Sequence, residues 1–247
     1  MKNIHLIMPM AGGGVRFENE GYLSPKPLIE IADKPFFYWA TRSVSKFLKV
    51  EDITYVVLKQ HVENFHIDSV IKKYFPNAKI KVIDKVLKGA VLTCVEGIKD
   101  IKDNMPILIN DCDHAFVSDS FYNYCREGNF NGIDGALLTF SSSDPAYSFA
   151  ETDNHNNVIR TVEKQVISNR AICGAYYFGN ANIFNNAVER YLDKCNYQEY
   201  FISGVYNILI EEGYCIQSFF VDKHLSFGTP GEYALAKEST KEFEEWR

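Results

Sequence analysis

The chain has 247 residues, of which 46% are hydrophobic and 23% charged, and its formal net charge is −6. This composition is typical of a soluble globular α/β protein. The acidic balance argues against a nucleic-acid-binding protein, because such proteins usually present a basic surface to phosphates. Residues 1–10 are too short an apolar run for a signal peptide, and no apolar run reaches the roughly 18 residues of a transmembrane helix. We therefore expect a cytoplasmic protein with neither a nucleic-acid nor a membrane partner.

Six cysteines are spread along the chain, and none of them forms a Cys-x-x-Cys pair. In a chain of this length, such spacing favours free thiols over a disulfide framework or a zinc site.

The first half of the sequence alternates between apolar strands and amphipathic helices. The predicted strands are 4–10, 53–58, 79–83 and 106–110, and the predicted helices are 35–48, 63–75 and 89–101. The unbroken apolar run at 4–10 is typical of a strand buried on both faces of a parallel sheet. The alternation predicts right-handed crossovers between parallel strands.

The second half has a different pattern, with several strands joined by tight turns. Strands are predicted at 135–140, 148–151, 158–163, 172–178 and 214–221, and helices at 181–192, 200–212 and 231–247. The Asn-rich segment 154–157 predicts a hairpin turn. The whole pattern predicts one α/β domain, 1–247, with a Rossmann-like three-layer α/β/α fold and a mixed, mainly parallel central sheet.

A glycine-rich loop follows the first strand and carries Gly12, Gly13, Gly14, Arg16 and, after a further stretch, Lys26 between two prolines. Glycines allow backbone N–H groups to approach a polyphosphate closely, and the two cations could hold its charged oxygens. The loop lacks the Gly-Lys-Ser/Thr of a Walker A motif and the third glycine of a dinucleotide fingerprint. A flexible turn with two solvated cations is the alternative, but the preceding strand and the Pro-Lys-Pro segment favour phosphate binding.

Two acidic residues, Asp111 and Asp113, follow the fourth predicted strand. Carboxylates at this position lie at the carboxyl edge of a parallel sheet, where ligands bind in open α/β folds. One or two carboxylates with substrate phosphates are the ligands that Mg²⁺ prefers. The alternative is a polar strand end with aspartates in turn positions. We favour Asp113 as the metal ligand, while a lone histidine such as His114 is more often structural.

Three further residues could contact substrates, but each also has a simple structural explanation. Gly89 opens a predicted helix whose free N–H groups could contact a base or a ribose. Lys164 ends a predicted strand and could hold an acceptor phosphate, although such lysines are usually solvated. Thr229 precedes a proline at the start of the last predicted helix, as expected of a helix cap.

Taken in order, these motifs resemble the sugar-phosphate nucleotidyltransferase (NTP-transferase) family over about residues 4–232. Its members share the glycine-rich loop with Arg, the Pro-Lys-Pro segment, the metal-binding Asp, a Glu-Lys element, a Gly-x-Tyr-Tyr-Phe strand and a late Gly-Thr-Pro. The resemblance implies a nucleotide-binding half at 1–115, an acceptor-binding half at 116–247, and Mg²⁺ as cofactor. Short members with a Met-Pro-Met-Ala-Gly start look like enzymes of capsule and surface-glycan pathways.

The resemblance also implies roles for individual residues. The nucleotide would be bound by Ala11, Gly12, Gly13, Gly14 and Gly89, and its negative charge would be stabilised by Arg16 and Lys26. The acceptor would be held by Lys164, Gly174 and Thr229. The metal would be held by Asp113. Many members carry a second metal-binding Asp where this chain has Ser226, so Asp222 or Asp111 would replace it.

The implied reaction transfers a nucleotide from CTP, UTP or dTTP to a phosphorylated metabolite such as a sugar 1-phosphate, with release of pyrophosphate. One alternative is a cytidylyltransferase acting on a polyol, choline or amino-acid phosphate. Alternatives from other classes are a GT-A type glycosyltransferase that uses a nucleotide-sugar, and a non-catalytic nucleotide-binding regulator, which Ser226 would suit. The base, the acceptor and the oligomeric state stay open here, and the aromatic second half offers a face for a homodimer.

Overall fold

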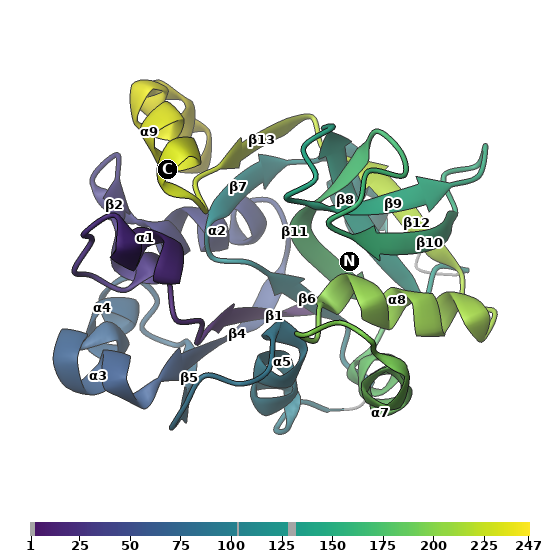
Figure 1. Ribbon diagram of the computed structural model, residues 1–247, viewed down its shortest axis with the longest axis horizontal. Helices are drawn as coiled ribbons and strands as arrows, with labels where there is room; N and C mark the ends of the chain where they lie inside the picture. Colours follow the sequence, from purple (N-terminus) through teal and green to yellow (C-terminus); the bar gives the residue numbers. More distant parts are fainter. Residues whose placement is uncertain (1–2, 103, 128–131) are drawn as a thin grey trace.

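The computed structural model describes residues 3–102, 104–127 and 132–247. Within these residues, a nine-stranded central sheet is covered by helices on both faces (Figure 1). Its strands are β1 Ile4–Met10, β4 Val50–Leu58, β5 Lys79–Ile83, β6 Ile107–Asn110, β8 Gly135–Ser141, β9 Ser148–Thr152, β10 Val158–Glu163, β11 Arg170–Phe178 and β12 Ile216–Phe220.

The sheet combines parallel and antiparallel pairing. Strands β5, β4, β1 and β6 lie side by side in that order, and each pair among them is parallel. Strand β11 pairs antiparallel with β6 and continues to β8 and β9, while β12 pairs parallel with β8. The expected α/β fold with a mixed, mainly parallel sheet is confirmed, and the strand direction changes where the second half of the chain joins the first.

The helices form a layer on each face of the sheet. They are α1 Val15–Asn19, α2 Phe36–Ser45, α3 Lys59–Phe65, α4 Ile67–Tyr74, α5 Ala90–Ile98, α6 Asp119–Glu127, α7 Ala181–Lys194, α8 Ile202–Glu211 and α9 Pro230–Glu238, with short 3₁₀ segments η1 Lys26–Leu28 and η2 Thr240–Trp246. Helices α5, α7 and α8 pack on one face, and α2 and α6 on the other. None of the helices in the described part of the chain is long and apolar enough to cross a membrane.

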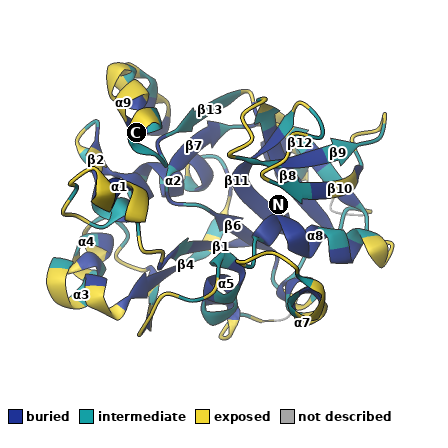
Figure 2. Cartoon of the chain, viewed as in Figure 1, coloured by how far each residue is buried: buried dark blue, intermediate teal, exposed yellow. Residues whose placement is uncertain are grey.

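Strand β1 lies near the middle of the sheet and is buried along most of its length (Figure 2). Ile7 belongs to the apolar cluster beneath α5, α7 and α8, whereas Leu6 belongs to the cluster beneath α2 and α6. Because successive side chains of a strand point to opposite faces, a strand covered on both sides needs apolar residues throughout. This accounts for the apolar run from which the strand was predicted, and its one polar residue, His5, is buried with its ring nitrogen 2.7 Å from the Thr54 hydroxyl.

Two predicted helices are interrupted in the structure. The predicted helix 63–75 is divided into α3 and α4 at His66, whose φ of 51° is left-handed and cannot continue a right-handed helix. The predicted helix 231–247 is divided into α9 and η2 at Ser239. Segment η2 turns back over the body of the protein, and the indole of Trp246 donates a hydrogen bond of 2.9 Å to the carbonyl of Phe116.

Sequence reasoning missed a two-stranded antiparallel ribbon, made of β7 His114–Val117 and β13 Lys223–Ser226. Each strand has only four residues, and their pairing joins segments that are far apart in the sequence. The register places His114 opposite Ser226. The ribbon therefore brings the residue after Asp113 next to the late Gly-Thr-Pro segment.

The hairpin turn predicted at 154–157 is confirmed between β9 and β10. The Asp153 carboxylate accepts hydrogen bonds from the backbone N–H groups of His155 and Asn157, at 2.8 and 2.9 Å, and Asn156 adopts a φ of 63°. Such a side-chain-to-backbone turn is typical of Asx residues.

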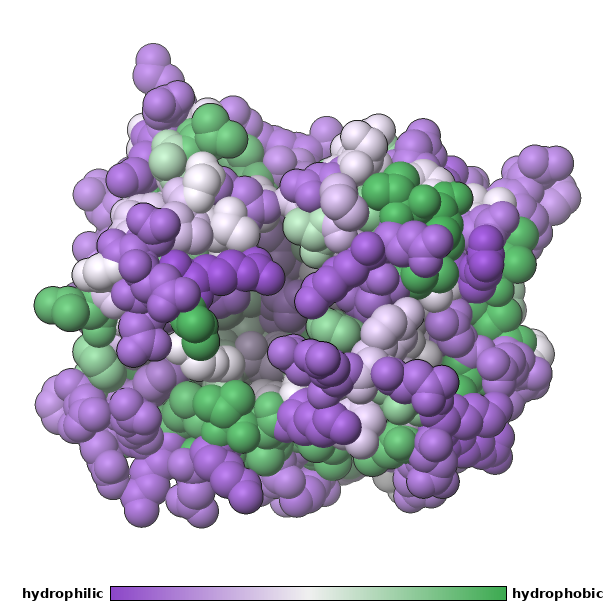
Figure 3. All heavy atoms as spheres, viewed as in Figure 1, coloured by the Kyte–Doolittle hydropathy of each residue, from purple (hydrophilic) through white to green (hydrophobic). Residues whose placement is uncertain are grey.

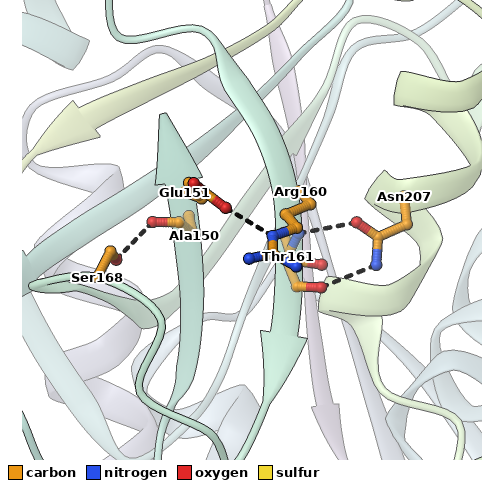
Figure 4. Close-up of polar contacts among 6 residues, drawn as sticks. All are labelled: Ala150, Glu151, Arg160, Thr161, Ser168 and Asn207. Carbon is orange, nitrogen blue, oxygen red and sulfur yellow. Dashed lines mark hydrogen bonds and ion pairs between the residues drawn. The ribbon is translucent and has the colours of Figure 1, made fainter. Parts of the chain in front are cut away.

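Strand β10 is held by an amide side chain from helix α8 (Figure 4). Asn207 accepts a hydrogen bond from the Thr161 N–H at 2.8 Å and donates one to the Thr161 carbonyl at 2.9 Å. The amide thus replaces the partner that a further strand would supply, and it protects the edge of the sheet. Figure 4 also shows the cross-strand pair Arg160–Glu151 and the bond from Ser168 to the Ala150 carbonyl.

We predict that Asn207→Ala lowers the free energy of unfolding by about 1–3 kcal/mol, because both backbone groups of the buried Thr161 lose their partner. Urea unfolding would measure the change. The matched control is Gln217→Ala, which removes an exposed amide bond to the His155 carbonyl. Equal effects of the two substitutions would contradict the role assigned to Asn207.

Candidate active site

A cavity of about 270 Å³ opens at the carboxyl edge of β1 and β6. The face shown in Figure 3 is hollowed near its centre. The lining of this first cavity includes seven residues that the sequence pointed to: Ala11, Gly12, Gly14, Lys26, Gly89, Asp111 and Asp113. Gly13 instead lines a neighbouring hollow beside His61. The glycine-rich loop, the strand end after β6 and the start of α5 therefore meet at one place.

The loop owes its shape to Gly14 and Phe17. Gly14 has a φ of 66° and starts α1 in a left-handed conformation, which glycine adopts without strain. Phe17 is buried and packs edge-on against Tyr22 and Phe36. Because Phe17 anchors α1 to the core, the preceding Arg16 remains exposed, and it lines a hollow shared with Lys26, Asp113 and Gly228 rather than the first cavity.

Lys26 and Asp113 form an ion pair, with Nζ 2.6 Å from Oδ2. Burial alone would lower the pKa of Lys26, but the carboxylate of Asp113 more than offsets this, so the pKa is raised above its ordinary value. Burial would raise the pKa of Asp113, but the charge and hydrogen bond of Lys26 hold it below its ordinary value. Both groups are therefore charged at neutral pH.

Asp111 lies beside this pair and carries the excess negative charge of the site. Burial, together with the charge of Asp113, raises the pKa of Asp111 to about 7. Its backbone N–H donates to the Gly174 carbonyl at 2.9 Å, which fixes the end of β6 against β11. Two buried carboxylates facing one ammonium group form a set of hard oxygen donors that suits a divalent cation such as Mg²⁺.

Two glycines leave room for these carboxylates. A Cβ at Gly174, where φ is 94°, would lie 2.9 Å from Oδ2 of Asp111, and a Cβ at Gly228 would collide with the carboxylate of Asp113. Side chains at either position would push the aspartates from their places.

Asp222 does not reach this site, and its expected role as a metal ligand is corrected. Its carboxylate accepts a hydrogen bond of 2.7 Å from the backbone N–H of Asp119, at the start of α6. It precedes β13, whereas Ser226 ends that strand, so the ribbon separates Asp222 from Asp113. Asp111, adjacent to Asp113, remains as the second candidate ligand.

A second cavity of about 240 Å³ lies on the other side of the carboxylates. Arg16, Asp111 and Asp113 line it together with residues of the second half, including Gly174 and Thr229. Asp111 and Asp113 line both cavities, so the two spaces meet at the carboxylates.

The structure moves Lys164 away from its expected place. Its side chain is exposed, and its ammonium lies 5.2 Å from the centre of the Phe201 ring rather than in the lining of the second cavity. Thr229 does line the cavity and also caps α9, because its hydroxyl accepts a hydrogen bond of 3.2 Å from the Glu232 N–H. Thr229 therefore caps the helix, as the structural alternative predicts, and its expected contact with the acceptor stays a prediction.

Sequence reasoning missed several residues of the second cavity. The Tyr147 hydroxyl donates a hydrogen bond of 2.5 Å to the Glu232 carboxylate, which links the loop before β9 to α9. His114 and His224 also line the cavity, and burial lowers their pKa values to about 4 and about 3, so both rings are neutral at neutral pH. Of these residues, His114 was considered in the sequence analysis, and Glu232 lies two residues after the Gly-Thr-Pro segment.

Gly89 has a packing role in addition to lining the first cavity. It has a φ of 107°, and a Cβ there would lie 2.5 Å from the backbone nitrogen and oxygen of Tyr200. The Tyr200 N–H donates to the Lys88 carbonyl, and its carbonyl accepts from the Val91 N–H. The start of α5 is therefore joined to the segment before α8.

Comparison with known proteins identifies this arrangement. A family model described as nucleotidyl transferase matches residues 6–242. The chain belongs to the nucleotidyl transferase family. The expected nucleotidyltransferase is thereby confirmed, and the family favours it over the glycosyltransferase alternative.

Three similar proteins illustrate the relationship. The crystal structure of a nucleoside-diphosphate-sugar pyrophosphorylase from Vibrio cholerae RC9 matches with a TM-score of 0.81 and 22% identity, over 94% of this chain and 99% of that one. The inositol-1-phosphate CTP transferase from T. maritima matches with a TM-score of 0.77 and 13% identity, over 99% and 97%. A 2-C-methyl-D-erythritol 4-phosphate cytidylyltransferase from Fusobacterium nucleatum subsp. nucleatum is 25% identical over 168 residues, 64% of this chain and 69% of that protein.

We predict different effects for two glycines of the first cavity. Gly12→Ala should leave the free energy of unfolding within about 0.5 kcal/mol of wild type, since no heavy atom lies within 4 Å of the added Cβ, but should weaken nucleotide binding. Gly89→Ala should lower the free energy of unfolding by about 1–3 kcal/mol, because it combines a positive φ with a backbone collision.

Urea unfolding and titration calorimetry with NTPs would separate these effects. A large loss of stability in Gly12→Ala, or none in Gly89→Ala, would contradict the assignment.

Proposed function

We propose that this nucleotidyltransferase binds an NTP in the first cavity and a phosphorylated small molecule in the second. The observation that supports this most strongly is that the two cavities meet at Asp111 and Asp113, with Lys26 and Arg16 beside them. The lining of the first cavity comes from the first half of the chain, and that of the second comes mostly from the second half. This supports a nucleotide-binding half at 1–115 and an acceptor-binding half at 116–247 within one domain.

In the proposed reaction, an oxygen of the acceptor phosphate forms a bond to the α-phosphorus of the NTP. The bond from that phosphorus to the bridging oxygen of the β-phosphate breaks, and pyrophosphate leaves with the electron pair. The attacking phosphate is already anionic, so the step requires no strong general base. The protein supplies position and charge: backbone N–H groups of the glycine-rich loop hold the phosphates, and Arg16 and Lys26 stabilise their negative oxygens.

Asp113 and Asp111 would hold Mg²⁺, which, when bound, would neutralise charge on the triphosphate. The ion pair with Lys26 keeps Asp113 ionised, as a metal ligand must be. Gly174 and Gly228 leave these carboxylates free of steric hindrance.

We further propose CTP as the first nucleotide to test and a polyol or sugar phosphate as the acceptor. Two of the relatives are named for cytidylyl transfer, one to inositol 1-phosphate and one to 2-C-methyl-D-erythritol 4-phosphate. The pyrophosphorylase relative is named for nucleoside-diphosphate sugars. UTP or dTTP with a sugar 1-phosphate is therefore the second substrate pair to test. The Met-Pro-Met-Ala-Gly motif of this chain resembles that of short family members from capsule and surface-glycan pathways. This resemblance supports cytoplasmic synthesis of precursors for such glycans.

The test is release of pyrophosphate in the presence of Mg²⁺, with five NTPs screened against phosphorylated sugars, polyols, choline and amino acids. We expect release that depends on one NTP and one acceptor together. Binding of NTP without release across the whole panel would instead support a non-catalytic regulator.

We predict that Arg16→Ala and Lys26→Ala each lower kcat/KM by about 10²–10³-fold, because each removes a cation aimed at charge that develops during transfer. The rate of pyrophosphate release, with one substrate saturating and the other varied, would measure kcat/KM. The control is Lys59→Ala, which removes an exposed lysine of α3 that pairs loosely with Glu63. Turnover near wild type in both variants would contradict the proposed roles of the two cations.

A further inference from the structure

The wall of the second cavity contains three side chains for which the proposed reaction has no use. They are His114 on β7, Cys173 on β11 and His224 on β13. Each offers one nitrogen or sulfur atom, and these atoms all lie within 4.8 Å of one another. They form a cluster, named here the His–Cys–His cluster, in which three separate strands contribute one side chain each.

The register of the β7–β13 ribbon brings the two histidines together. His114 pairs with Ser226, and His224 pairs with Phe116, so the histidines are diagonal neighbours on one ribbon, with ring centres 5.5 Å apart. Cys173 immediately precedes Gly174, whose carbonyl is bonded to the backbone at the end of β6. The sheet and the ribbon thus fix all three positions through backbone pairing.

The histidine nitrogens in this cluster have unmet hydrogen-bonding capacity. His114 is 2% exposed, and within residues 3–102, 104–127 and 132–247 neither of its ring nitrogens makes a hydrogen bond of good geometry, although the backbone of Gly174 lies close enough to raise its pKa slightly against the effect of burial. Nε2 of His224 likewise makes no hydrogen bond of good geometry in that part of the chain, and the ring lies near the backbone of Cys173. Buried polar atoms are normally satisfied, so such a group points to an ion or an ordered water that completes it.

Aromatic neighbours limit how far the rings can turn. The ring of His114 stacks on Phe116 with an interplanar angle of 16°, and the ring of His224 lies with its centre 4.2 Å from that of Phe140. The nitrogens therefore remain directed toward the cluster rather than toward solvent.

We propose that His114, Cys173 and His224 bind a transition-metal ion of the zinc class, at a site separate from the Mg²⁺ carboxylates. Imidazole nitrogen and thiolate sulfur are the ligands preferred by Zn²⁺ and Co²⁺, whereas Mg²⁺ prefers oxygen. Ligand atoms around tetrahedral zinc lie roughly 3–4 Å apart, so the cluster needs to close by about an ångström. On binding, the Cys173 thiol loses its proton to solvent and the sulfur bonds to the metal.

Three protein ligands leave one tetrahedral position free, and all three side chains line the second cavity. A water molecule or a donor atom of a molecule in that cavity would complete the coordination. The absence of a side chain at Gly174 keeps the space between His114 and Asp111 open, since a Cβ there would lie 3.1 Å from Nε2 of His114. This proposal stands on the cluster itself and does not depend on the proposed reaction.

The test is a titration of metal-free protein with Co²⁺ in the presence of excess Mg²⁺, which occupies the carboxylates. We expect one equivalent of Co²⁺ to produce a thiolate-to-cobalt charge-transfer band in the near ultraviolet and the visible bands of a tetrahedral ion. Zn²⁺ should abolish both, because it binds such sites more tightly than Co²⁺. Cys173→Ser should remove the charge-transfer band, and His224→Gln should weaken Co²⁺ binding at least about tenfold.

Cys125→Ser is the matched control, because Cys125 is buried in the same apolar cluster as Cys173 but lies on α6, outside the His–Cys–His cluster. It should leave the spectrum unchanged. Absence of the charge-transfer band in wild type, or its survival in Cys173→Ser, would overturn the proposal. If Cys173→Ser fails to fold by circular dichroism, unchanged affinity in His224→Gln overturns it instead. Pyrophosphate release measured on the same preparations separates failure of this site from failure of the proposed function.

Discussion

The partly buried ion pair between Lys26 and Asp113 joins two segments that lie 87 residues apart, and most of the site is arranged around it. A buried pair repays the cost of desolvation only when its geometry is good and its surroundings are polar. Here the Pro-Lys-Pro segment brings in the lysine, the end of β6 brings in the carboxylate, and Gly228 leaves the space that the carboxylate occupies. The pair joins the Pro-Lys-Pro end of the glycine-rich loop to the sheet edge.

The site is crowded at its centre and open on both sides. Gly174 and Gly228 approach Asp111 and Asp113 so closely that neither position has room for a side chain. The two cavities extend from this centre in different directions, one lined by the first half of the chain and one largely by the second. In the proposed function, specificity for the nucleotide and specificity for the acceptor would therefore be set by different parts of the sequence, and each could change without altering the shared carboxylates.

Sequence reasoning worked where the signal was local. The bounds of β1, β5 and β10 follow from apolar periodicity, and the glycine-rich loop with Asp111 and Asp113 follows from short motifs beside strand ends. It did not anticipate the surroundings of Asp222 and Lys164, because these depend on where the β7–β13 ribbon and helix α8 lie in space, and the role of Lys164 stays a prediction. The His–Cys–His cluster was hidden for the same reason: no spacing along the chain reveals three ligands that meet only through strand register.

The anchoring of Trp246 has a consequence for how the protein is made. Its side chain is wholly buried and bonded to the carbonyl of Phe116, a residue 130 positions earlier on the strand that follows Asp113. Chains fold from the N-terminus as they leave the ribosome, and such a distant contact forms late. The glycine-rich loop and β1 can therefore fold early. The ribbon that carries His114 cannot pack against Trp246 until translation has passed residue 246.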